Sequence, residues 1–436
     1  MDALLAARLQ MAFSLGFHII FAVIGMVMPL FMSASYWLYL KKKEPDALEL
    51  TKIWMKGVAI FFAVGAVSGT LLSFELGLLW PEFMKHAGPI IGLPFSLEGT
   101  AFFLEAIALG IFLYGFDRLS PWKHWFASLM VGLSGVTSGI FVMAVNAWMN
   151  APQGFEYKNG AYINIEPIKA MFNDAFFSQT HHMTLAAFTS VSAGVLGIHS
   201  YLYLKGRRRS LNLLAIKVTL PFFIISSVLQ PLSGDLAAKD IAVRQPIKLA
   251  AMEALFDTQE GAPLILGGIP DVENEKVNYA IHIPKALSFL AHGDFSKPVK
   301  GLKEFPKEEW PPVLIVHFAF QIMIFCGSLL ALGAIMALFC LIRKRPVVNY
   351  PWLLKYFIWI SPLGIIALEA GWTVTEVGRQ PWIIYGFMKT KDALTEAPAL
   401  QLTFYTYLLL YFFLMGVVCW LFYRLILVHF LKKDEA

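Results

Sequence analysis

Two carboxylates, Glu98 and Glu105, lie inside the strongly apolar stretch SLEGTAFFLEAIALGIFLYGF at residues 96–116. An ionisable side chain near the bilayer centre costs about 2.5 to 3.5 kcal/mol on insertion scales, so two of them in one span are not accidental. Seven residues make two helical turns, which places both carboxyls on nearly one face, roughly 10 Å apart along the axis. The two carboxyl groups therefore point toward the same neighbouring element.

Further polar residues inside apolar stretches are of types that suit metal and proton chemistry. They are His18, Glu75, Asn146, His181, His182, His317, Glu369 and Glu376, with Met323 at similar depth. Counted from the predicted helix ends, His18, His182, Met323, Glu98 and Glu376 fall in the outer half of the bilayer. Imidazole, thioether and carboxylate all suit an iron porphyrin, and a His/Met pair holds a six-coordinate electron-transfer haem. A single protein ligand leaves the iron open to oxygen.

Each of these residues also has an ordinary interpretation. A lone membrane histidine such as His18 is more often a hydrogen-bonding core residue, and Met323 alone fits ordinary packing. Glu369 and Glu376 are seven residues apart on one helix face and fit a structural ion pair with Arg379 equally well. Spacing alone does not identify haem.

The elements that must position these residues are membrane helices. The chain of 436 residues is 58% hydrophobic and 15% charged, with a mean hydropathy of +0.62, which excludes an ordinary soluble protein. We predict an all-α polytopic fold with about nine transmembrane helices, at 13–39, 53–79, 94–117, 124–148, 179–204, 212–233, 312–342, 352–376 and 400–428. The first run is too long for a signal peptide and has no small-residue cleavage site, so it is a span.

Basic residues set the orientation of these spans. They flank alternate connections, at 41–43, Arg118 with Lys123, 205–209, 343–345 and 432–433. The side rich in Lys and Arg faces the cytoplasm, which puts the N-terminus outside and the C-terminus in the cytoplasm. The net charge of +5 reflects this asymmetry and does not indicate nucleic-acid binding. The cysteines all lie in spans, which argues against a disulfide framework or a CxxC metal site.

The chain divides into three regions: 1–233 with six spans, a connection at 234–311 that lies outside, and 312–436 with three spans. The connection is rich in Pro, Lys and Glu, and connections of this length are usually functional or disordered. Within it, QPIKLAAMEALFDT at 245–258 predicts a short amphipathic helix where a ligand could dock.

Longer stretches carry a resemblance to a known family. They are RLQ at 8–10 before FHIIFAVIG, SLEGTAFFLEA, NAWMNAPQG at 146–154, SGD followed by QPIKLAAMEA, and GWTVTEVGRQPW at 371–382. Over essentially its whole length the chain resembles subunit I of the cytochrome bd family of quinol oxidases, in its branch with a short outer loop. GRQPW with an upstream GWxxxE is a specific signature. The nine spans and the connection after the sixth agree with that family's plan.

The resemblance implies a terminal respiratory oxidase, a quinol:oxygen oxidoreductase in the cytoplasmic membrane of a bacterium or archaeon. Such an enzyme oxidises quinol at the outer face and reduces O2 to water with cytoplasmic protons, generating a proton-motive force without pumping. The implied partners are subunit II, a small accessory subunit, quinol, O2 and membrane lipid, with no nucleic acid.

The resemblance also implies two haem b groups, one low-spin and one high-spin, and one haem d. His182 and Met323 match the axial ligands of the low-spin haem b iron, with His181 as a competing candidate. His18 and Glu376 match the single ligands of the other two haem irons, and which serves which haem stays open.

The remaining matched residues support these groups. Arg379 and Trp372 are the further cofactor-binding candidates, with Arg379 neutralising haem propionates. Glu98 and Glu105 match the paired acidic residues on the proton path to the oxygen site, with Asn146 as a weaker candidate. An alternative role for the two carboxylates is to anchor a water or an arginine beside a haem.

Lys248 and Glu253 match residues tied to quinol oxidation. A carboxylate near the quinol hydroxyl accepts a proton, while a lysine holds an oxygen. One departure from the family pattern concerns FAFQIM, where Gln321 replaces an Arg found in better-studied members two residues before the methionine ligand. The family's tuning of the low-spin haem potential therefore does not carry over to this chain. The outer loop is also compact, as in the short-loop branch, and this leaves the quinone preference open.

Three rival interpretations remain on the sequence alone. A proton-coupled secondary transporter would use intramembrane Glu and His as a substrate and proton site, without haem. A haem–copper oxidase would need several more membrane histidines, and only the adjacent His181 and His182 hint at one. A non-catalytic assembly partner would not need Lys248 and Glu253.

Overall fold

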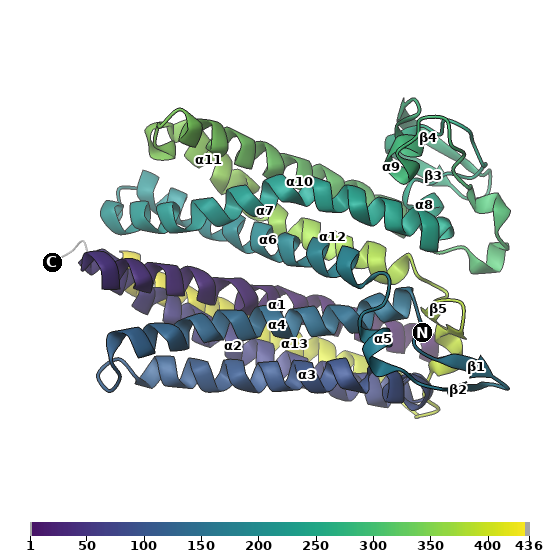
Figure 1. The fold of residues 1–436 in the computed structure, drawn as a ribbon, viewed down its shortest axis with the longest axis horizontal. Helices are drawn as coiled ribbons and strands as arrows, with labels where there is room; N and C mark the ends of the chain where they lie inside the picture. The colour runs from purple at the N-terminus through teal and green to yellow at the C-terminus, as the bar shows by residue number, and fades with distance from the viewer. Residues whose placement is uncertain (1, 432–436) are drawn as a thin grey trace.

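The computed structural model describes residues 2–431 of the chain. Within that part, nine helical segments are long and apolar enough to cross a membrane (Figure 1). They are α1 (Ala3–Lys42), α2 (Pro45–Leu79), α3 (Pro81–Tyr114), α4 (Pro121–Asn150), α6 (Phe176–Leu204), α7 (Arg209–Arg244), α10 (Val313–Ile342), the pair α11 (Pro351–Ile360) and α12 (Leu363–Val377), and α13 (Leu400–Ile426), which η5 (Leu427–Leu431) continues. The predicted all-α polytopic fold is confirmed. The basic pair at 432–433 lies outside the described residues.

The long helices run side by side along the long axis of the molecule (Figure 1). Helix α1 packs against α2, α4 and α13, α3 packs against α4, and α6, α7, α10 and α12 form the other half of the bundle. Apolar side chains such as Phe31, Met32 and Leu50 are fully buried in the centre. The bundle therefore has a packed interior, and buried polar side chains such as Glu75 and Glu105 lie in it, away from lipid.

Several helices extend beyond the apolar runs that predict them. Helix α1 begins at Ala3, where the Asp2 carboxylate accepts a hydrogen bond of 2.6 Å from Leu5 N. Proline occupies the first turn of α2, α3 and α4, the position where its fixed φ suits helix initiation. Hydropathy locates the apolar part of a helix, whereas capping and proline set its end.

Helix α7 continues beyond the predicted sixth apolar run, which stops at residue 233, and ends at Arg244. Its last turns carry the i,i+4 ion pairs Lys239–Asp235 and Arg244–Asp240, which support a helix in a polar setting. The predicted span 352–376 is interrupted between Ile360 and Leu363. Pro362 lies in this break, and its lack of a backbone N–H to donate to the preceding turn accounts for the interruption.

The α7–α10 connection (residues 245–312) is folded. It contains α8 (Pro246–Met252), β3 (Leu264–Asp271), β4 (Lys276–Ile283), α9 (Ala286–His292), η1 (Leu302–Glu304) and η2 (Lys307–Glu309). The helix predicted at 245–258 is present over α8, but it has no exposed face, because residues 247–252 are all buried. Strands β3 and β4 pair antiparallel in the β3–β4 hairpin, which the sequence did not predict.

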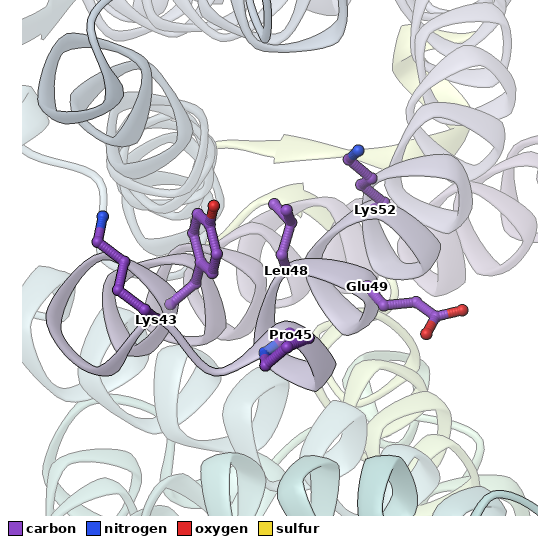
Figure 2. Close-up of a pocket in the computed structure, with 6 residues that line it drawn as sticks. Lys43, Pro45, Leu48, Glu49 and Lys52 are labelled. Atoms are coloured by element: carbon purple, nitrogen blue, oxygen red, sulfur yellow. The ribbon is translucent and has the colours of Figure 1, made fainter.

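Short elements complete the chain. They are the hairpin of β1 (Glu156–Lys158) and β2 (Ala161–Ile163), α5 (Pro167–Met171), η3 (Val347–Asn349), the hairpin of β5 (Trp382–Ile384) and β6 (Met388–Lys389), and η4 (Thr390–Ala393). A shallow surface hollow lies where α1 ends and α2 begins, with Tyr39, Lys43, Pro45, Leu48, Glu49 and Lys52 around it (Figure 2). It is at the opposite end of the bundle from the β3–β4 hairpin and contains none of the predicted site residues (Figure 1).

Candidate functional site

His18 on α1 and His182 on α6 are oriented by the same device. Ser68 Oγ lies 3.0 Å from His18 Nδ1, and Ser233 Oγ lies 2.8 Å from His182 Nδ1. Each hydroxyl donates its single proton to a backbone carbonyl of its own helix, so it accepts from the ring. Nδ1 therefore carries the proton, and Nε2 has the lone pair that an imidazole uses to bind a metal. At His182, the side-chain nitrogen of Gln230 lies 3.3 Å from this Nε2.

Three other buried histidines have no serine partner among the described residues. His124, His199 and His317 each have both ring nitrogens within hydrogen-bond distance of fixed protein atoms, as expected of structural residues. His181 stacks on the Phe177 ring, with centroids 5.6 Å apart and planes 4° from parallel. Of the adjacent pair, His182 is the one whose Nδ1 contacts a serine hydroxyl, whereas the ring of His181 stacks on Phe177.

The Met323 thioether lies against a glycine on the neighbouring helix. A Cβ placed on Gly371 of α12 would lie only 3.2 Å from Met323 Sδ, so any larger residue would displace the sulfur. Helix α6, which carries His182, and helix α10, which carries Met323, both pack against α7 and α12. Trp372 follows the glycine and is partly buried. The two proposed axial ligands thus flank the same pair of helices.

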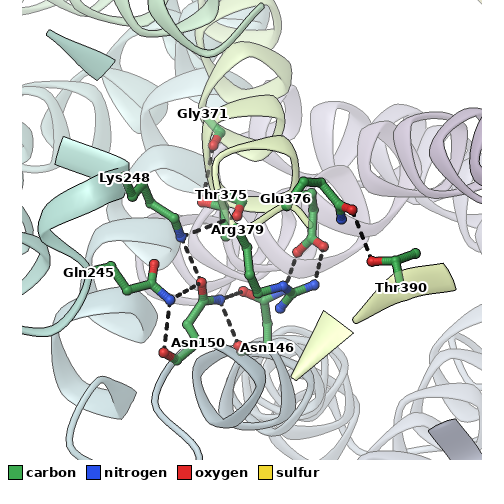
Figure 3. A network of polar contacts seen from close by, with 10 residues as sticks. Asn146, Asn150, Gln245, Lys248, Gly371, Thr375, Glu376, Arg379 and Thr390 are labelled. Carbon is green, nitrogen blue, oxygen red and sulfur yellow. Dashed lines mark hydrogen bonds and ion pairs between the residues drawn. The ribbon is translucent and has the colours of Figure 1, made fainter. Parts of the chain in front are cut away.

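A polar network surrounds the end of α12 (Figure 3). Asn146 of α4 donates from Nδ2 to Glu376 Oε1, and Arg379 donates from a guanidinium nitrogen to Glu376 Oε2 at 2.6 Å. The ion pair predicted as an alternative for Glu376 is therefore present. It does not include Glu369, whose Oε2 lies 3.3 Å from a Cβ built on Gly16.

The Arg379 guanidinium is buried, and only some of its N–H groups have hydrogen-bond acceptors. Its side chain is 2% exposed, and Nε and one terminal nitrogen have no hydrogen-bond partner among the described residues. A buried guanidinium with unused donors is costly, and planar anions such as carboxylates satisfy its fork geometry. The site therefore fits an anionic group such as a porphyrin propionate.

The same network reaches α8 through a residue that the sequence analysis missed. Lys248 Nζ donates to Asn150 Oδ1 at 2.7 Å and to Thr375 O at 3.3 Å, and Asn150 Nδ2 donates to Asn146 Oδ1 at 3.2 Å (Figure 3). A continuous chain joins Lys248 through Asn150 and Asn146 to Glu376. The signal was in NAWMN, where Asn150 follows Asn146 by one helical turn on the same face.

Lys248 in α8 and Glu253, which directly follows that helix, both have strongly shifted pKa values. Burial, together with the charge of Arg379, lowers the pKa of Lys248 to about 7, and the charge of Glu376 opposes that shift. Glu253 caps α8 and is fully buried, which raises its pKa to about 8, while a hydrogen bond of 3.3 Å from Ile265 N to Oε2 opposes the shift. Oε1 of Glu253 has no partner among the described residues. Burial thus shifts the pKa values of Lys248 and Glu253 toward neutrality, a pattern that is common among acid–base residues.

Glu98 and Glu105 of α3 both face α4. Ser138 Oγ donates to Glu98 Oε1 at 3.2 Å, and the buried carboxyl carbon of Glu105 lies 3.4 Å from a Cβ built on Gly135. Gly25 of α1 borders Glu105 on the other side, at 3.8 Å from Oε1 by the same measure. These glycines leave room for the carboxyl where three helices meet.

Within residues 2–431, hydrogen bonds join four of the predicted site residues into one network: Lys248, Asn146, Glu376 and Arg379. The others occupy separate positions in the bundle interior or its connection.

The chain matches known proteins along its length. Residues 6–429 match the family described as cytochrome bd terminal oxidase subunit I. A Bacillus subtilis protein named "Putative cytochrome bd menaquinol oxidase subunit I" is 36% identical, over 100% of this chain and 98% of its own. The cytochrome bd ubiquinol oxidase subunit 1 of the same organism is 30% identical, over 97% and 93%. The structure of bd oxidase from Geobacillus thermodenitrificans superimposes with a TM-score of 0.91 at 38% identity, covering 97% of this chain and 98% of that one.

Proposed function

The chain belongs to the family of cytochrome bd terminal oxidase subunit I, and on that premise we propose the residues and the sidedness by which it works. Members of this family are quinol:oxygen oxidoreductases of the bacterial cytoplasmic membrane that use haem cofactors and typically act with a subunit II. Family membership overrides the transporter, haem–copper oxidase and assembly-partner alternatives.

The proposed haem-binding residues follow from the side chains described above. His182 and Met323 hold the low-spin haem b, His18 and Glu376 each hold one of the other two haems, a high-spin b and a d, and Arg379 pairs with propionates. The support is the serine contact at Nδ1 of both histidines, which leaves the Nε2 lone pair for a metal, the space that Gly371 leaves for the Met323 sulfur, and the unused donors of Arg379. When bound, these groups carry electrons from quinol to oxygen and supply the site of its reduction.

We place quinol oxidation beside α8. The observation that carries this assignment is the pair of buried residues Lys248 and Glu253, whose pKa values of about 7 and about 8 lie near neutrality. Ionised Glu253 is then a stronger base than an exposed carboxylate and accepts a proton from the quinol hydroxyl, while Lys248 donates a hydrogen bond to a quinol oxygen. The hydrogen-bonded connection from Lys248 to Glu376 and Arg379 supports a quinol site close to a haem (Figure 3).

The proposed sidedness rests on where the basic residues lie. The connections after α1, α3, α6 and α10 share one end of the bundle, and α8 with the β3–β4 hairpin lies at the other (Figure 1). With the basic end in the cytoplasm, protons from quinol leave on the outside. Protons for oxygen reduction come from the cytoplasm through Glu98 and Glu105. Charge separation then builds a proton-motive force without pumping.

A reduced-minus-oxidised spectrum of the purified complex, with haem extraction, tests the cofactor assignment. We expect haem b bands together with a far-red chlorin band. A folded complex without haem would contradict the proposal.

Quinol-dependent oxygen uptake tests the role of Glu253. Because the base must be ionised, kcat/KM for quinol rises with pH through the Glu253 pKa of about 8. Glu253→Gln is expected to remove that limb and to lower the rate about 100-fold or more, the usual contribution of a general base. Glu260→Gln, at an exposed position of the same connection, is the control. Wild-type quinol turnover in Glu253→Gln would refute the assignment.

A further inference from the structure

The residue that departs from the family pattern, Gln321, binds the backbone of the β3–β4 hairpin. Its side-chain Oε1 accepts a hydrogen bond from Gly267 N at 3.0 Å, and its Nε2 donates to Ile265 O at 2.9 Å. Both ends of one amide are thus used on alternate residues of β3. An arginine has donors alone, so at this position it would leave Gly267 N without that acceptor.

His317 lies one helical turn before Gln321 on α10 and contacts the same strand, β3. Its ring is fully buried, with Nε2 at 3.0 Å from Gly267 O and Nδ1 at 2.8 Å from Met252 O. Positions i and i+4 share one helix face, so this face of α10 contacts both β3 and the end of α8.

The fourth contact of this edge of β3 is Glu253. Ile265 N donates to Glu253 Oε2 at 3.3 Å, while the carbonyl of the same residue accepts from Gln321. Alternate residues of a strand direct their N–H and C=O groups to one edge, and here Ile265 and Gly267 direct theirs away from β4. All four backbone groups of that edge have side-chain partners: Gln321 twice, His317 and Glu253. The edge, which would otherwise be left unpaired, is occupied by two side chains of α10 and the proposed base.

We propose that Gln321, assisted by His317, is a positioning residue for quinol oxidation: it fixes β3 so that Ile265 N holds the Glu253 carboxylate in place. This inference rests on the proposed role of Glu253 as the base, and it explains what holds the Glu253 carboxylate in its orientation. Gln321 precedes Met323 by two residues, so the helix that carries a proposed iron ligand also holds the proposed base.

Hydrogen exchange of the complete complex, followed by mass spectrometry over residues 264–271, tests the contact directly. Gln321→Leu removes both hydrogen bonds, and we expect exchange of the Ile265 and Gly267 amides to accelerate by about tenfold, the equivalent of about 1.4 kcal/mol. Gln321→Glu keeps the acceptor for Gly267 N and is expected to give an intermediate increase. Gln259→Leu, the same change at an exposed glutamine of the connection, should exchange like the wild type.

Kinetics of the same variants test the purpose of the contact. We expect Gln321→Leu to lower kcat with quinol several-fold, Gln321→Glu to recover part of that loss, and both to keep wild-type haem content. Oxygen uptake with an artificial donor that bypasses quinol, such as a phenylenediamine, should be unchanged in both. A general loss of structure would lower both rates together.

Two results would overturn the inference: wild-type exchange over 264–271 in Gln321→Leu, or faster exchange with wild-type quinol kinetics. The proposed quinol site fails separately, on wild-type turnover of Glu253→Gln. In that case Gln321 has no catalytic role through Glu253. The exchange data still show whether Gln321 holds β3.

Discussion

At the scale of single residues, the proton path gives the sharpest test. Glu105 is buried where α1, α3 and α4 meet, and glutamine has its size without a titrating proton. On the proposed path, Glu105→Gln slows oxygen reduction by about 100-fold, the usual contribution of a proton-transfer group, while haem content is retained. Oxygen uptake and the haem spectrum are the measurements.

The matched control is Glu82→Gln, which removes an exposed carboxylate at the start of the same helix. It should leave both readings at wild-type values. Unchanged turnover of Glu105→Gln with full haem loading would refute the relay and favour a supporting role for this carboxylate.

Asn150 connects two proposed sites and is also testable alone. Replacing it with leucine leaves the buried Lys248 ammonium without its 2.7 Å partner, which costs about 1 to 3 kcal/mol. We expect a higher KM for quinol in Asn150→Leu, measured as oxygen uptake, and little change at Asn349→Leu, an exposed asparagine of η3. An unaltered KM would mean that Lys248 needs no support from α4.

At the scale of elements, glycines set how closely helices approach around the proposed ligands. Gly371→Ala puts a methyl 3.2 Å from Met323 Sδ, so the sulfur or α12 must shift. We expect weaker methionine ligation, seen as a changed low-spin haem b spectrum and a shifted potential. Gly416→Ala on α13, where a Cβ meets no atom within 4 Å, is the control and should leave the spectrum unchanged. A wild-type spectrum in Gly371→Ala would argue against Met323 as a ligand.

The sequence predicted the elements better than their ends and contacts. Long apolar runs predict membrane-spanning helices directly, because a helix forms all its backbone hydrogen bonds within itself, as lipid requires. The extension of α7 to Arg244 depends on local ion pairs, and the break before Leu363 depends on a proline. A hydropathy average over many residues does not detect either of them.

The β3–β4 hairpin was missed for a different reason. Strand β3 reads LILGGIPD, with two glycines and a proline that argue against a strand. Its free edge is satisfied by Gln321, His317 and Glu253, partners that lie far from it in sequence or across a turn. At the site, residue types and family motifs predicted the candidate ligands, whereas the serine partners of His18 and His182 become visible when helices are placed side by side.

At the scale of the whole molecule, orientation is the property to measure. Single cysteines replacing Lys276 on β4 and Lys205 after α6 lie at opposite ends of the bundle. A membrane-impermeant thiol reagent applied to intact cells should label Lys276→Cys and spare Lys205→Cys, with the parent chain as the control for its three native cysteines. Labelling of Lys205→Cys alone would reverse the proposed sidedness.

The chain from Lys248 to Glu376 has a consequence for energy conservation. Its two inner members, Asn150 and Asn146, are amides, whose donor and acceptor ends are chemically fixed and do not titrate in the physiological range. Such a link orients the groups at both ends, yet it does not pass a proton from one to the other. On the proposed assignment, electrons leave the quinol for the haems, but its protons do not follow them along this link to Glu376. They leave on the outer side instead, so the charges of the quinol are separated.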